Sequence, residues 1–351
     1  MCQNDLQQQF PKNHIIKDLC GGKSVMVYIK KFFLDEVIDG AAHIPHPAFV
    51  VDFKEIDGIY ISKFQNVLID GLAYSLPNRD PATGVDFDTA VKACEKKGKG
   101  FHLMTAAEWS AIALWCQKNG CLPFGNNGLG KDIREKESGA RISYQNEEHT
   151  VCRTATGTGP VTWSHNGRSD GIYDLNANVW EWVGGLRLVC GEVQVLPNNN
   201  GASTHDSQSA FSKDWRAIDG SNGAWIIPDG NATTPNSVKL DFVNDRWVYV
   251  SGQITSLFDG FRFCNFADVT ANVSICDKAK EHLYALGCLP TPLYQETEVS
   301  FYANNGGTER IPFRGGRWGQ GRNAGVFKTC FDDPRTYSGD AVGFRSAYYE
   351  A

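Results

Sequence analysis

The stretch of sequence that decides the fold reads PFRGGRWGQGRNAGVFKTCFDDPRTYSGDAVGFR and covers residues 312–345. Glycines, aromatic residues and arginines punctuate it at Arg314-Gly315-Gly316, Trp318, Gly325-Val326-Phe327 and Gly343-Phe344-Arg345. Between these points lie unlike side chains that follow no apolar period. A backbone held by glycines and aromatic residues, with arbitrary side chains between them, indicates a rigid scaffold that presents a surface.

The composition of the chain bounds the class of protein. Its 351 residues, 42% of them hydrophobic and 21% charged, are typical of a globular protein with one large domain or two ordinary ones. The 36 glycines and 9 tryptophans predict many turns around an aromatic-rich core. A net charge of −6 argues against nucleic-acid binding, which needs a basic face. No apolar run reaches the roughly 20 residues that span a bilayer.

The N-terminus and the cysteines indicate a reducing compartment. Residues 1–22 lack the basic start and apolar middle of a secretory signal, and no apolar stretch before Cys20 supports a lipoprotein anchor. The 11 cysteines are scattered without a Cys-x-x-Cys pair, which favours free or buried thiols. The 8 histidines do not fall at ligand spacing from the cysteines, so a zinc cluster is not expected.

Local patterns predict three helices. They are expected over residues 86–98, 105–120 and 277–286, each with an apolar face and a glycine at or just after its end. The second begins with a capping box, in which the Thr105 hydroxyl meets the N–H of Glu108 while the Glu108 side chain reaches back.

Strand patterns are concentrated in the first part of the chain. Residues 25–33 have the β-branched and aromatic content of a strand. Residues 49–53 and 59–64 are also strand-like, and Asp57-Gly58 between them predicts a hairpin turn. Residues 191–245 are polar and rich in glycine, asparagine and serine, which indicates elaborated loops with short strand-like pieces.

Four stretches together resemble one family: YISKF (60–64), HLMTAAEW (102–109), DLNANVWEW (174–182) and RGGRW…VGFR (314–345). They are similar to the formylglycine-generating-enzyme (sulfatase-modifying factor) branch of the C-type lectin fold, whose members read approximately RLPTEAEW, D-x-x-GNVWEW and RGGSW…GFR. The resemblance implies a loop-rich α+β fold with two main helices and a mixed or antiparallel sheet. Residues 49–351 would form this domain, with loop insertions at 191–260, and prolines at 45 and 47 would set off residues 1–48 as an N-terminal segment of unknown role.

Within that branch, the C-terminal stretch is most similar to the variable proteins of diversity-generating retroelements. These include phage tail receptor-binding proteins and bacterial surface proteins whose C-terminal region is rewritten by mutagenic reverse transcription. The resemblance implies a hypervariable, non-catalytic ligand-binding protein with its variable region at residues 312–348. The partner would be a protein or other macromolecule on a target surface, and the protein would be a phage virion component or cytoplasmic.

In this family, adenines of AAY codons are randomised, which yields residues such as Arg, Gly, Cys, Asp, Tyr, Ala, Ser or Asn but never Lys or Gln. Gln320 and Lys328 are therefore not expected to vary. Most residue types pass this filter, so it is a consistency check. The positions implied as variable and ligand-binding are Arg317, Gly319, Arg322, Asn323, Cys330, Asp332, Asp333, Tyr337, Gly339, Asp340 and Ala341. The positions implied as scaffold are Gly315, Gly316, Trp318, Phe327, Gly343, Phe344 and Arg345.

The enzymes of the branch use a cysteine pair inside this C-terminal motif to bind copper and activate oxygen. At the matching places this sequence has Gln320 and Ala324 or Gly325, and Cys330 is single. Without a pair of thiols this chemistry is not expected, and no catalytic residue is predicted. The alternatives are an oxygen-dependent modifying enzyme of this type and a structural phage tail protein.

The enzymes also bind calcium in the segment that corresponds to residues 174–181. Carried over by position, the ligands would be the side chains of Asp174 and Glu181 and the backbone carbonyls of Ala177 and Val179, an oxygen set that suits a hard cation. Ala177 replaces a glycine of the family. The alternative is that both acidic side chains only accept hydrogen bonds from loop amides, and no other cofactor is implied.

The lectin label does not imply sugar binding here. The sequence contains neither Glu-Pro-Asn nor Gln-Pro-Asp, the tripeptides that mark calcium-dependent sugar recognition in C-type lectins. Arg, Tyr and Asp gathered in one stretch are residue types that protein interfaces use.

Overall fold

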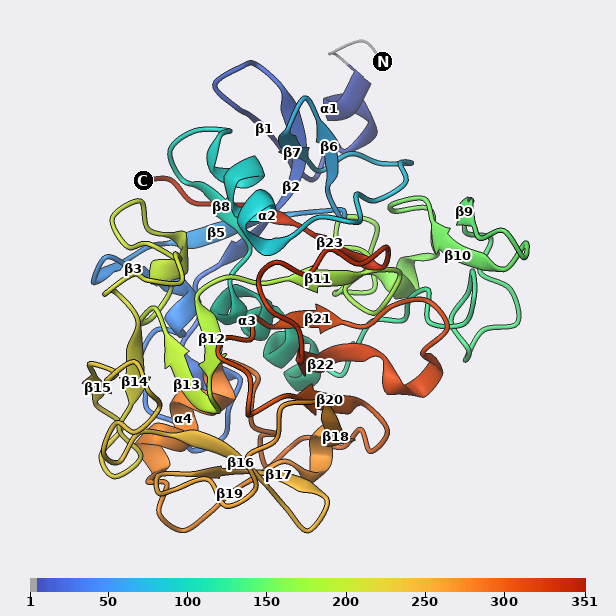
Figure 1. Cartoon of the computed structure of the whole chain (residues 1–351). Helices are drawn as coiled ribbons and strands as arrows, with labels where there is room; N and C mark the ends of the chain where they lie inside the picture. Colours follow the sequence, from blue (N-terminus) through green and yellow to red (C-terminus); the bar gives the residue numbers. More distant parts are fainter. Residues whose placement is uncertain (1–4) are drawn as a thin grey trace.

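Three of the four helices form where local patterns in the sequence predicted them, and the short first helix was not predicted. The computed structural model describes residues 5–351, in which α1 to α4 span Asp5–Gln9, Phe87–Glu95, Ala106–Lys118 and Asp277–Ala285 (Figure 1). Asp86 caps α2 by accepting the N–H of Thr89. Thr105 and Glu108 form the predicted capping box at α3.

The N- and C-terminal parts of the chain share one antiparallel sheet. Its five strands run in the order β1-β2-β5-β24-β8, with bounds His14–Lys17, Lys23–Lys30, Gly58–Ser62, Ser346–Tyr348 and Phe101–Leu103. The C-terminal strand β24 lies between β5 and β8, and the N-terminal strand β2 pairs with β5 along the length of β5. Residues before 49 are thus part of the same sheet and the same core as the rest of the chain.

The predicted hairpin around Asp57-Gly58 was wrong. The turn lies at Asp52 and Phe53, which have positive φ and join the short strands β3 (Val50–Val51) and β4 (Lys54–Glu55). Gly58 instead begins β5, where a Cβ would lie 2.5 Å from the carbonyl oxygen of Ile29 on β2. The glycine there permits the close approach of two strands, a long-range need that a local pattern cannot distinguish from a turn.

A mixed six-stranded sheet carries the C-terminal stretch. Its order is β18-β20-β22-β21-β11-β23, with bounds Arg262–Asn265, Ser300–Ala303, Gly325–Phe331, Phe313–Gly315, Trp180–Trp182 and Val342–Phe344. The pairs β20–β22 and β11–β23 are parallel and the other pairs are antiparallel. Three of the six strands come from residues 312–345, which confirms a loop-rich α+β fold with a mixed sheet.

The region that was expected to be loops with short strand-like pieces does contain short strands, among them residues 225–226, but they pair into a third sheet that was not predicted. Its strands are β12 (Leu186–Val189), β13 (Glu192–Val195), β14 (Arg216–Ile218), β15 (Trp225–Ile226), β16 (Lys239–Val243), β17 (Arg246–Val250) and β19 (Thr270–Ala271). Leu240 and Trp247 from this sheet are fully buried in the main core. The strands are two to five residues long and separated by turn residues, which made the segment resemble loops.

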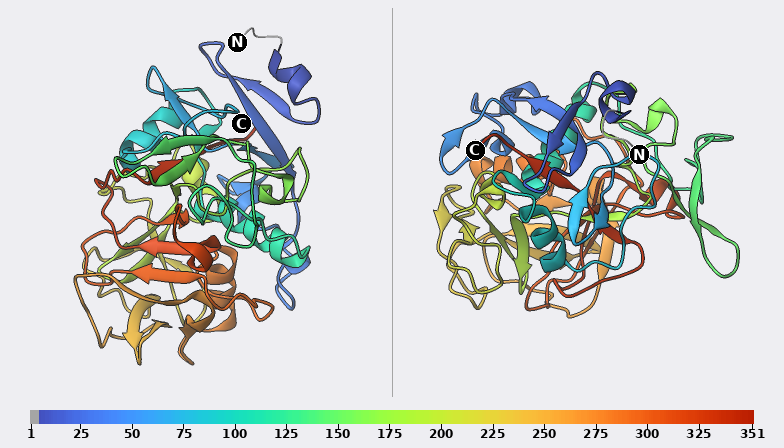
Figure 2. Two further views of the ribbon diagram at one scale, coloured as in Figure 1. Left: turned by 90° about the vertical axis from the view of Figure 1, so that its right-hand side faces the viewer. Right: turned by 90° about the horizontal axis from the view of Figure 1, so that it is seen from above.

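Two hairpins complete the structure. They are β6–β7 (Val67–Ile69 and Leu72–Tyr74) and β9–β10 (Ile142–Gln145 and Val151–Thr154). The β9–β10 hairpin projects sideways from the body of the molecule (Figure 2). Among residues 5–351, no helix combines the length and the apolar character that crossing a membrane requires.

The central helix α3 links the core to the C-terminal stretch. Almost every α3 side chain is buried, and Trp109 Nε1 donates to the carbonyl oxygen of Val326 on β22 at 2.7 Å. α3 is seen behind β11 and β21 in Figure 1. The sheet that carries residues 312–345 is therefore fixed to the main core from behind.

Candidate functional site

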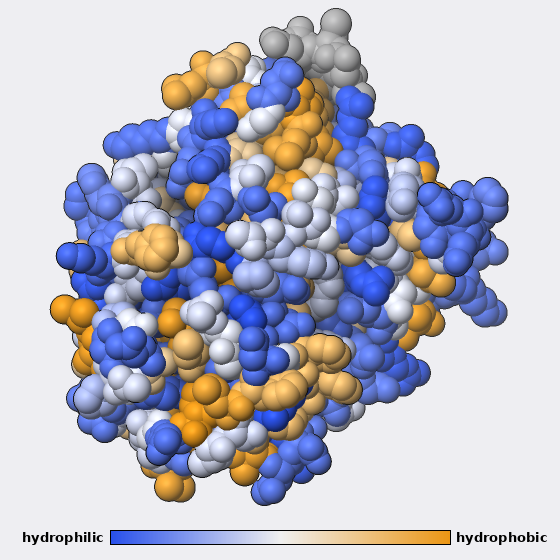
Figure 3. Space-filling model, viewed as in Figure 1, coloured by the Kyte–Doolittle hydropathy of each residue, from blue (hydrophilic) through white to orange (hydrophobic). Residues whose placement is uncertain are grey.

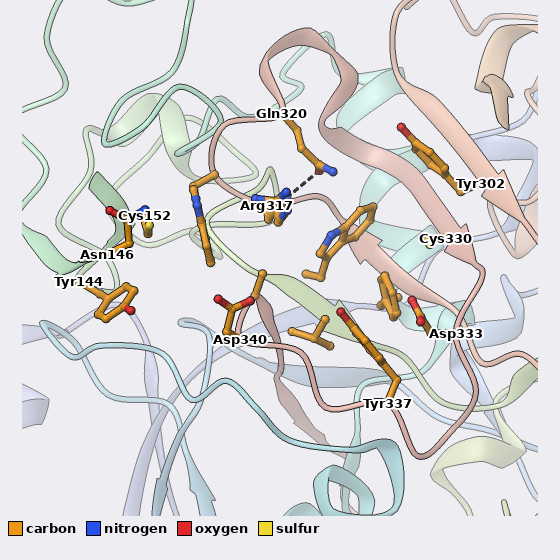
Figure 4. A pocket seen from close by; sticks show the side chains of 15 residues that line it. Tyr144, Asn146, Cys152, Tyr302, Arg317, Gln320, Cys330, Asp333, Tyr337 and Asp340 are labelled. Carbon is orange, nitrogen blue, oxygen red and sulfur yellow. Dashed lines mark hydrogen bonds between the residues drawn. The ribbon is translucent and has the colours of Figure 1, made fainter. Parts of the chain in front are cut away.

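The C-terminal stretch forms one side of a surface cavity of about 510 Å³ (Figure 4). The other side comes from the β9–β10 hairpin, β11 and β20. The lining residues are Tyr144, Asn146, Cys152, Trp180, Tyr302, Phe313, Arg317, Trp318, Gln320, Cys330, Asp333, Tyr337, Asp340, Ala341 and Val342. The cavity thus brings together segments that are far apart in the sequence.

Close contacts between backbones fix the frame of the cavity. Gly315 has a φ of +86°, and a Cβ on it would lie 2.8 Å from the carbonyl oxygen of Leu175. A Cβ on Gly343 would lie 2.3 Å from the carbonyl oxygen of Ala82. The N–H of Ala177 donates to the carbonyl oxygen of Gly315 at 3.1 Å. Only glycine permits these approaches, so both positions hold the backbone in place.

Two buried arginines tie the stretch to the body of the protein. Arg314 donates to the carbonyl oxygens of Gly287 (2.9 Å) and Leu286 (2.6 Å), where α4 ends, and so satisfies its last carbonyls. Arg345 forms a bidentate ion pair with Glu181, with Nε–Oε2 and Nη2–Oε1 distances of 2.5 Å and 2.6 Å. Both arginines are almost completely buried.

The remaining implied scaffold residues are also buried. Phe327 and Phe344 lie in the core, and Gly316 has a φ of +93°. Trp318 is 7% exposed and forms part of the cavity floor. Its backbone N–H donates to the carbonyl oxygen of Asn178 at 3.1 Å. Gln320, which retroelement mutagenesis does not yield, accepts the N–H of Arg317 through Oε1 at 2.9 Å and holds the turn between them.

The cavity brings together six of the eleven positions implied as variable. These are Arg317, Cys330, Asp333, Tyr337, Asp340 and Ala341. Arg317, Tyr337 and Asp340 are exposed and Asp333 is half-buried, whereas Cys330 (7% exposed) and Ala341 (8% exposed) offer little surface. The three exposed side chains and Asp333 therefore provide most of the surface that a ligand would contact.

The other five positions lie outside the cavity lining. Arg322 pairs with Glu298 at 3.1 Å beside a separate hollow of about 400 Å³. Asn323 contributes its backbone carbonyl, which accepts from Lys328 Nζ at 2.9 Å. Gly319, Asp332 and Gly339 lie in the loops next to the cavity but do not line it.

The electrostatics of the cavity differ between its two charged sides. Burial and the neighbouring charge of Asp332 raise the pKa of Asp333 to about 6. Opposite it, the guanidinium groups of Arg153 and Arg317 lie 5.9 Å and 5.5 Å from the Trp318 ring. The cavity floor at Trp318 thus has a carboxyl group with a raised pKa on one side and guanidinium cations on the other.

Lys328 lies behind the aromatic floor. Its Nζ is 5.2 Å from the Trp180 ring and 5.0 Å from the Tyr302 ring, and it donates to Ser300 Oγ at 2.8 Å. Burial lowers the pKa of Lys328 to about 7. Lys328, which is not expected to vary, therefore supports the aromatic residues Trp180 and Tyr302 of the cavity from within the protein.

Sequence reasoning missed the parts of the cavity that come from other segments. Tyr144 and Asn146 reach it from the β9–β10 hairpin, and Tyr302 reaches it from β20. The Arg153 guanidinium lies 4.1 Å from the Tyr144 ring and pairs with Asp80 at 2.8 Å. These residues carry no local motif, so only the fold reveals their place.

The cysteines at the cavity do not resemble a catalytic pair. Cys152 and Cys330 lie on opposite sides of it (Figure 4). Burial raises the pKa of the Cys330 thiol, which opposes formation of the reactive thiolate. Among residues 5–351, no three His, Cys, Asp or Glu side chains are grouped so that they could hold a metal ion.

Three of the four groups implied as calcium ligands, the Ala177 and Val179 carbonyls and the Glu181 carboxylate, converge on the side-chain amide of Gln65, together with the backbone carbonyl of Asp174. Gln65 Nε2 lies 3.2 Å from the carbonyl oxygens of Asp174 and Ala177, 3.1 Å from that of Val179 and 3.0 Å from Glu181 Oε1. Gln65 Oε1 accepts from Asn178 Nδ2 at 2.8 Å, which fixes the orientation of the amide.

The two acidic side chains of this segment have other partners. The Asp174 carboxylate accepts the N–H of Gly157 at 3.2 Å, and burial raises its pKa to about 6. Glu181 is neutralised by Arg345. In this arrangement the Gln65 amide stands among the oxygens that a calcium ion would use, so we derive no chemistry from calcium.

Comparison with known proteins gives one family match and several similar structures. Residues 30–202 match the model of the sulfatase-modifying factor enzyme 1-like domain family. PvdO from Pseudomonas aeruginosa is similar at 14% identity and a TM-score of 0.39, with 96% of this chain and 98% of that chain covered. Treponema denticola variable protein 1 is similar at 12% identity and a TM-score of 0.33, with 96% and 99% covered. A search of curated proteins gave no match. Residues 30–202, just under half of the chain, are therefore similar to the sulfatase-modifying factor enzyme 1-like domain, and the chain has the loop-rich α+β architecture that its motifs predicted.

Proposed function

We propose that the protein is a non-catalytic ligand-binding protein and that the 510 Å³ cavity, with the exposed loops around it, is its recognition surface. One observation carries this proposal. Six positions that the resemblance to retroelement variable proteins implies as replaceable line one cavity, above a frame whose own contacts are buried. A rigid frame lowers the entropy that binding would otherwise cost.

At three of these positions the frame uses the backbone and leaves the side chain free to change. The carbonyl oxygen of Asp333 accepts the N–H of Ile311 at 3.2 Å. The carbonyl oxygen of Asp340 accepts from Arg153 Nη1 at 3.2 Å. Arg317 is held through its N–H. Because backbone groups are common to all residues, other side chains at these positions keep the same hydrogen bonds.

The surroundings of the cavity favour a protein partner. Phe261 and Phe263 are 59% and 56% exposed, and the Phe263 ring stacks on Tyr302 with centroids 5.3 Å apart. Tyr302 also lines the cavity, so the apolar surface continues into it. Figure 3 shows hydrophobic colour gathered over β16, β18 and β20, below the mainly polar face over β11 and β21. An exposed aromatic patch with a polar rim is typical of protein interfaces.

The cavity also suggests which group the partner presents. Tyr337 lies between the half-buried carboxylate of Asp333 and the exposed carboxylate of Asp340 (Figure 4). The Trp318 ring already faces the protein's own Arg153 and Arg317, so a lysine or arginine side chain of the partner would gain from the Tyr337 ring and the two carboxylates. We expect the partner, a macromolecule on a target surface, to insert a basic side chain here.

The retroelement part of the proposal is tested in the neighbouring DNA. We expect a near-identical copy of the coding region for residues 312–348 beside a reverse-transcriptase gene, differing almost only at adenines. Deep sequencing of this region in a growing population should show substitutions at Arg317, Asp333, Tyr337 and Asp340 but not at Gly315, Trp318 or Gly343. Identical C-termini in all isolates would instead indicate a structural tail protein.

The enzymatic alternative is tested separately. With copper, oxygen and a cysteine-containing peptide, we expect no peptide oxidation, because Cys330 is buried, single and held protonated. Turnover that disappears in the Cys330→Ala variant would overturn the non-catalytic proposal.

A further inference from the structure

The C-terminal end of α3 places two cysteines side by side. The chain leaves the helix through Gly120, which has a φ of +63°. The N–H of Gly120 donates to the carbonyl oxygen of Gln117 at 3.2 Å, and the N–H of Cys121 donates to that of Cys116 at 3.0 Å. These two bonds define a Schellman motif, in which the residues at the positions of Cys116 and Cys121 regularly bring their side chains into contact.

In most proteins that contact is hydrophobic, but here both side chains are thiols. The sulfur of Cys116 lies 3.1 Å from the carbonyl oxygen of His165, and the sulfur of Cys121 lies 3.3 Å from the same oxygen. Two thiols that share one acceptor across a fixed turn are close enough to react with each other after a small movement.

The two thiols differ in the properties that oxidation requires. Cys116 is buried, and burial raises its pKa well above the usual value. Cys121 is partly exposed, and the hydrogen bond from the Cys116 thiol lowers the pKa of Cys121 to about 7. Cys121 is therefore the accessible thiol that ionises, and Cys116 is the protected neighbour that can resolve its oxidation product.

We propose that Cys116 and Cys121 form a reversible disulfide when the protein meets a peroxide. The Cys121 thiolate attacks the O–O bond of hydrogen peroxide, which gives a sulfenic acid and hydroxide. The Cys116 sulfur then displaces the sulfenic oxygen as the S–S bond forms. Overall, two thiols and one hydrogen peroxide yield one disulfide and two molecules of water. A dithiol reductant returns the disulfide to the two thiols by thiol–disulfide exchange and is itself oxidised to a disulfide.

The digestion pattern of trypsin offers a direct test. Trypsin cuts after Lys99, Lys118 and Lys131, so Cys116 and Cys121 fall on different peptides, 100–118 and 119–131, with one cysteine each. The folded full-length chain is treated with hydrogen peroxide, its remaining thiols are alkylated, and it is digested without reductant. We expect the two peptides to appear joined, with a mass two hydrogens below their sum, and to separate after treatment with dithiothreitol.

Single variants separate the two roles. In Cys116→Ser, we expect Cys121 to stop at the sulfenic acid and to be trapped by a dimedone-type reagent. In Cys121→Ser, we expect Cys116 to stay reduced because it is buried. The exposed Cys20 gives the matched control, since Cys20→Ser should leave the joined peptides unchanged.

Two results would overturn the proposal. One is the absence of joined peptides at a peroxide dose that fully oxidises Cys20. The other is joining that appears only after the chain is unfolded. Neither result bears on the proposed binding function, because the lining of the cavity contains neither cysteine.

Discussion

Two neighbouring segments of the six-stranded sheet region use their polar groups in opposite ways. In residues 174–182, side chains form the hydrogen bonds: Asn178 bonds to Gln65 and Thr154, and Glu181 bonds to Gln65 and Arg345. In residues 332–341, the positions that line the cavity form their hydrogen bonds through the backbone, and Tyr337 is 39% exposed. Arg335 is the exception, because its side chain donates to Glu309, Asp88 and the carbonyl oxygen of Gln208. Apart from Arg335, the first segment is fixed by the identity of its side chains and the second by the hydrogen bonds of its backbone.

The difference shows how one fold can hold a constant frame next to a replaceable surface. A buried polar group that loses its partner carries a large free-energy penalty. Replacing an exposed side chain carries almost no free-energy penalty when only the backbone of that residue forms hydrogen bonds. Stability measurements on matched variants of the two segments can break or sharpen this contrast.

The largest effect is expected from Arg345. Arg345→Ala leaves Glu181 buried without its counter-charge, so the free energy of unfolding should fall by about 3–5 kcal/mol. Urea unfolding followed by tryptophan fluorescence measures it. The matched control is Arg322→Ala, which breaks the exposed pair with Glu298 and should cost less than about 1 kcal/mol. Equal losses in the two variants would refute the contrast between the segments.

The next effect is expected from Gln65. Gln65→Ala removes the amide on which four oxygens converge and should lower the free energy of unfolding by about 1–3 kcal/mol. It also opens space among oxygens that suit a hard cation. We therefore expect added calcium to raise the melting temperature of Gln65→Ala but not that of the native protein. Calcium stabilisation of the native protein would show that the ion, and not the amide, belongs at this point.

Features set by neighbouring residues could be predicted from the sequence. The capping box of Thr105 and Glu108 depends on contacts three residues apart. The order of the four motifs indicated the fold, because the glycines and aromatic residues of each motif fix the backbone of that motif locally. Helix ends followed from the same local signals, whereas the mixed or antiparallel sheet was implied by the resemblance of the motifs to a known family.

Features set by distant residues could not be predicted. Gln65 meets the 174–181 segment across more than 100 positions in the sequence, and nothing around it indicates a partner. Tyr144 and Tyr302 reach the cavity only because the fold brings their hairpin and strand there. Gly58 was misassigned to a turn because its true constraint is the backbone of β2.

A smaller effect, with a diagnostic pH dependence, is expected from Asp333. Burial raises its pKa to about 6 in the folded protein, so the folded state holds the proton more tightly than the unfolded state. Its contribution to stability is greatest in acid and is lost as the pH rises from about 4 to about 6. Asp333→Asn should therefore stabilise the protein at neutral pH relative to the native chain, and this advantage should vanish at about pH 4.

The opposite sign is expected for Asp214. Hydrogen bonds from the Ser207 N–H and the Ser212 hydroxyl lower its pKa, so its contribution is present at neutral pH and is lost in acid. Asp214→Asn should destabilise the protein at neutral pH. Urea unfolding at several pH values measures both variants, and parallel pH profiles for the two would contradict the assignment for Asp333.

The smallest effect is expected at the replaceable positions. Arg317→Ser and Tyr337→Ser should each change the free energy of unfolding by no more than about 0.5 kcal/mol, because the backbone bonds that hold these loops remain. Trp318→Ser, in the cavity floor, should cost several times more, since Trp318 is 7% exposed and packs in a core cluster that includes Trp180 and Phe313. Thermal and urea unfolding of the three variants measure the differences.

If Tyr337→Ser costs as much as Trp318→Ser, the loop depends on its side chains, and a surface of this kind is not free to vary. If it costs almost nothing while binding of a partner is lost, recognition and folding are carried by different residues of the same stretch.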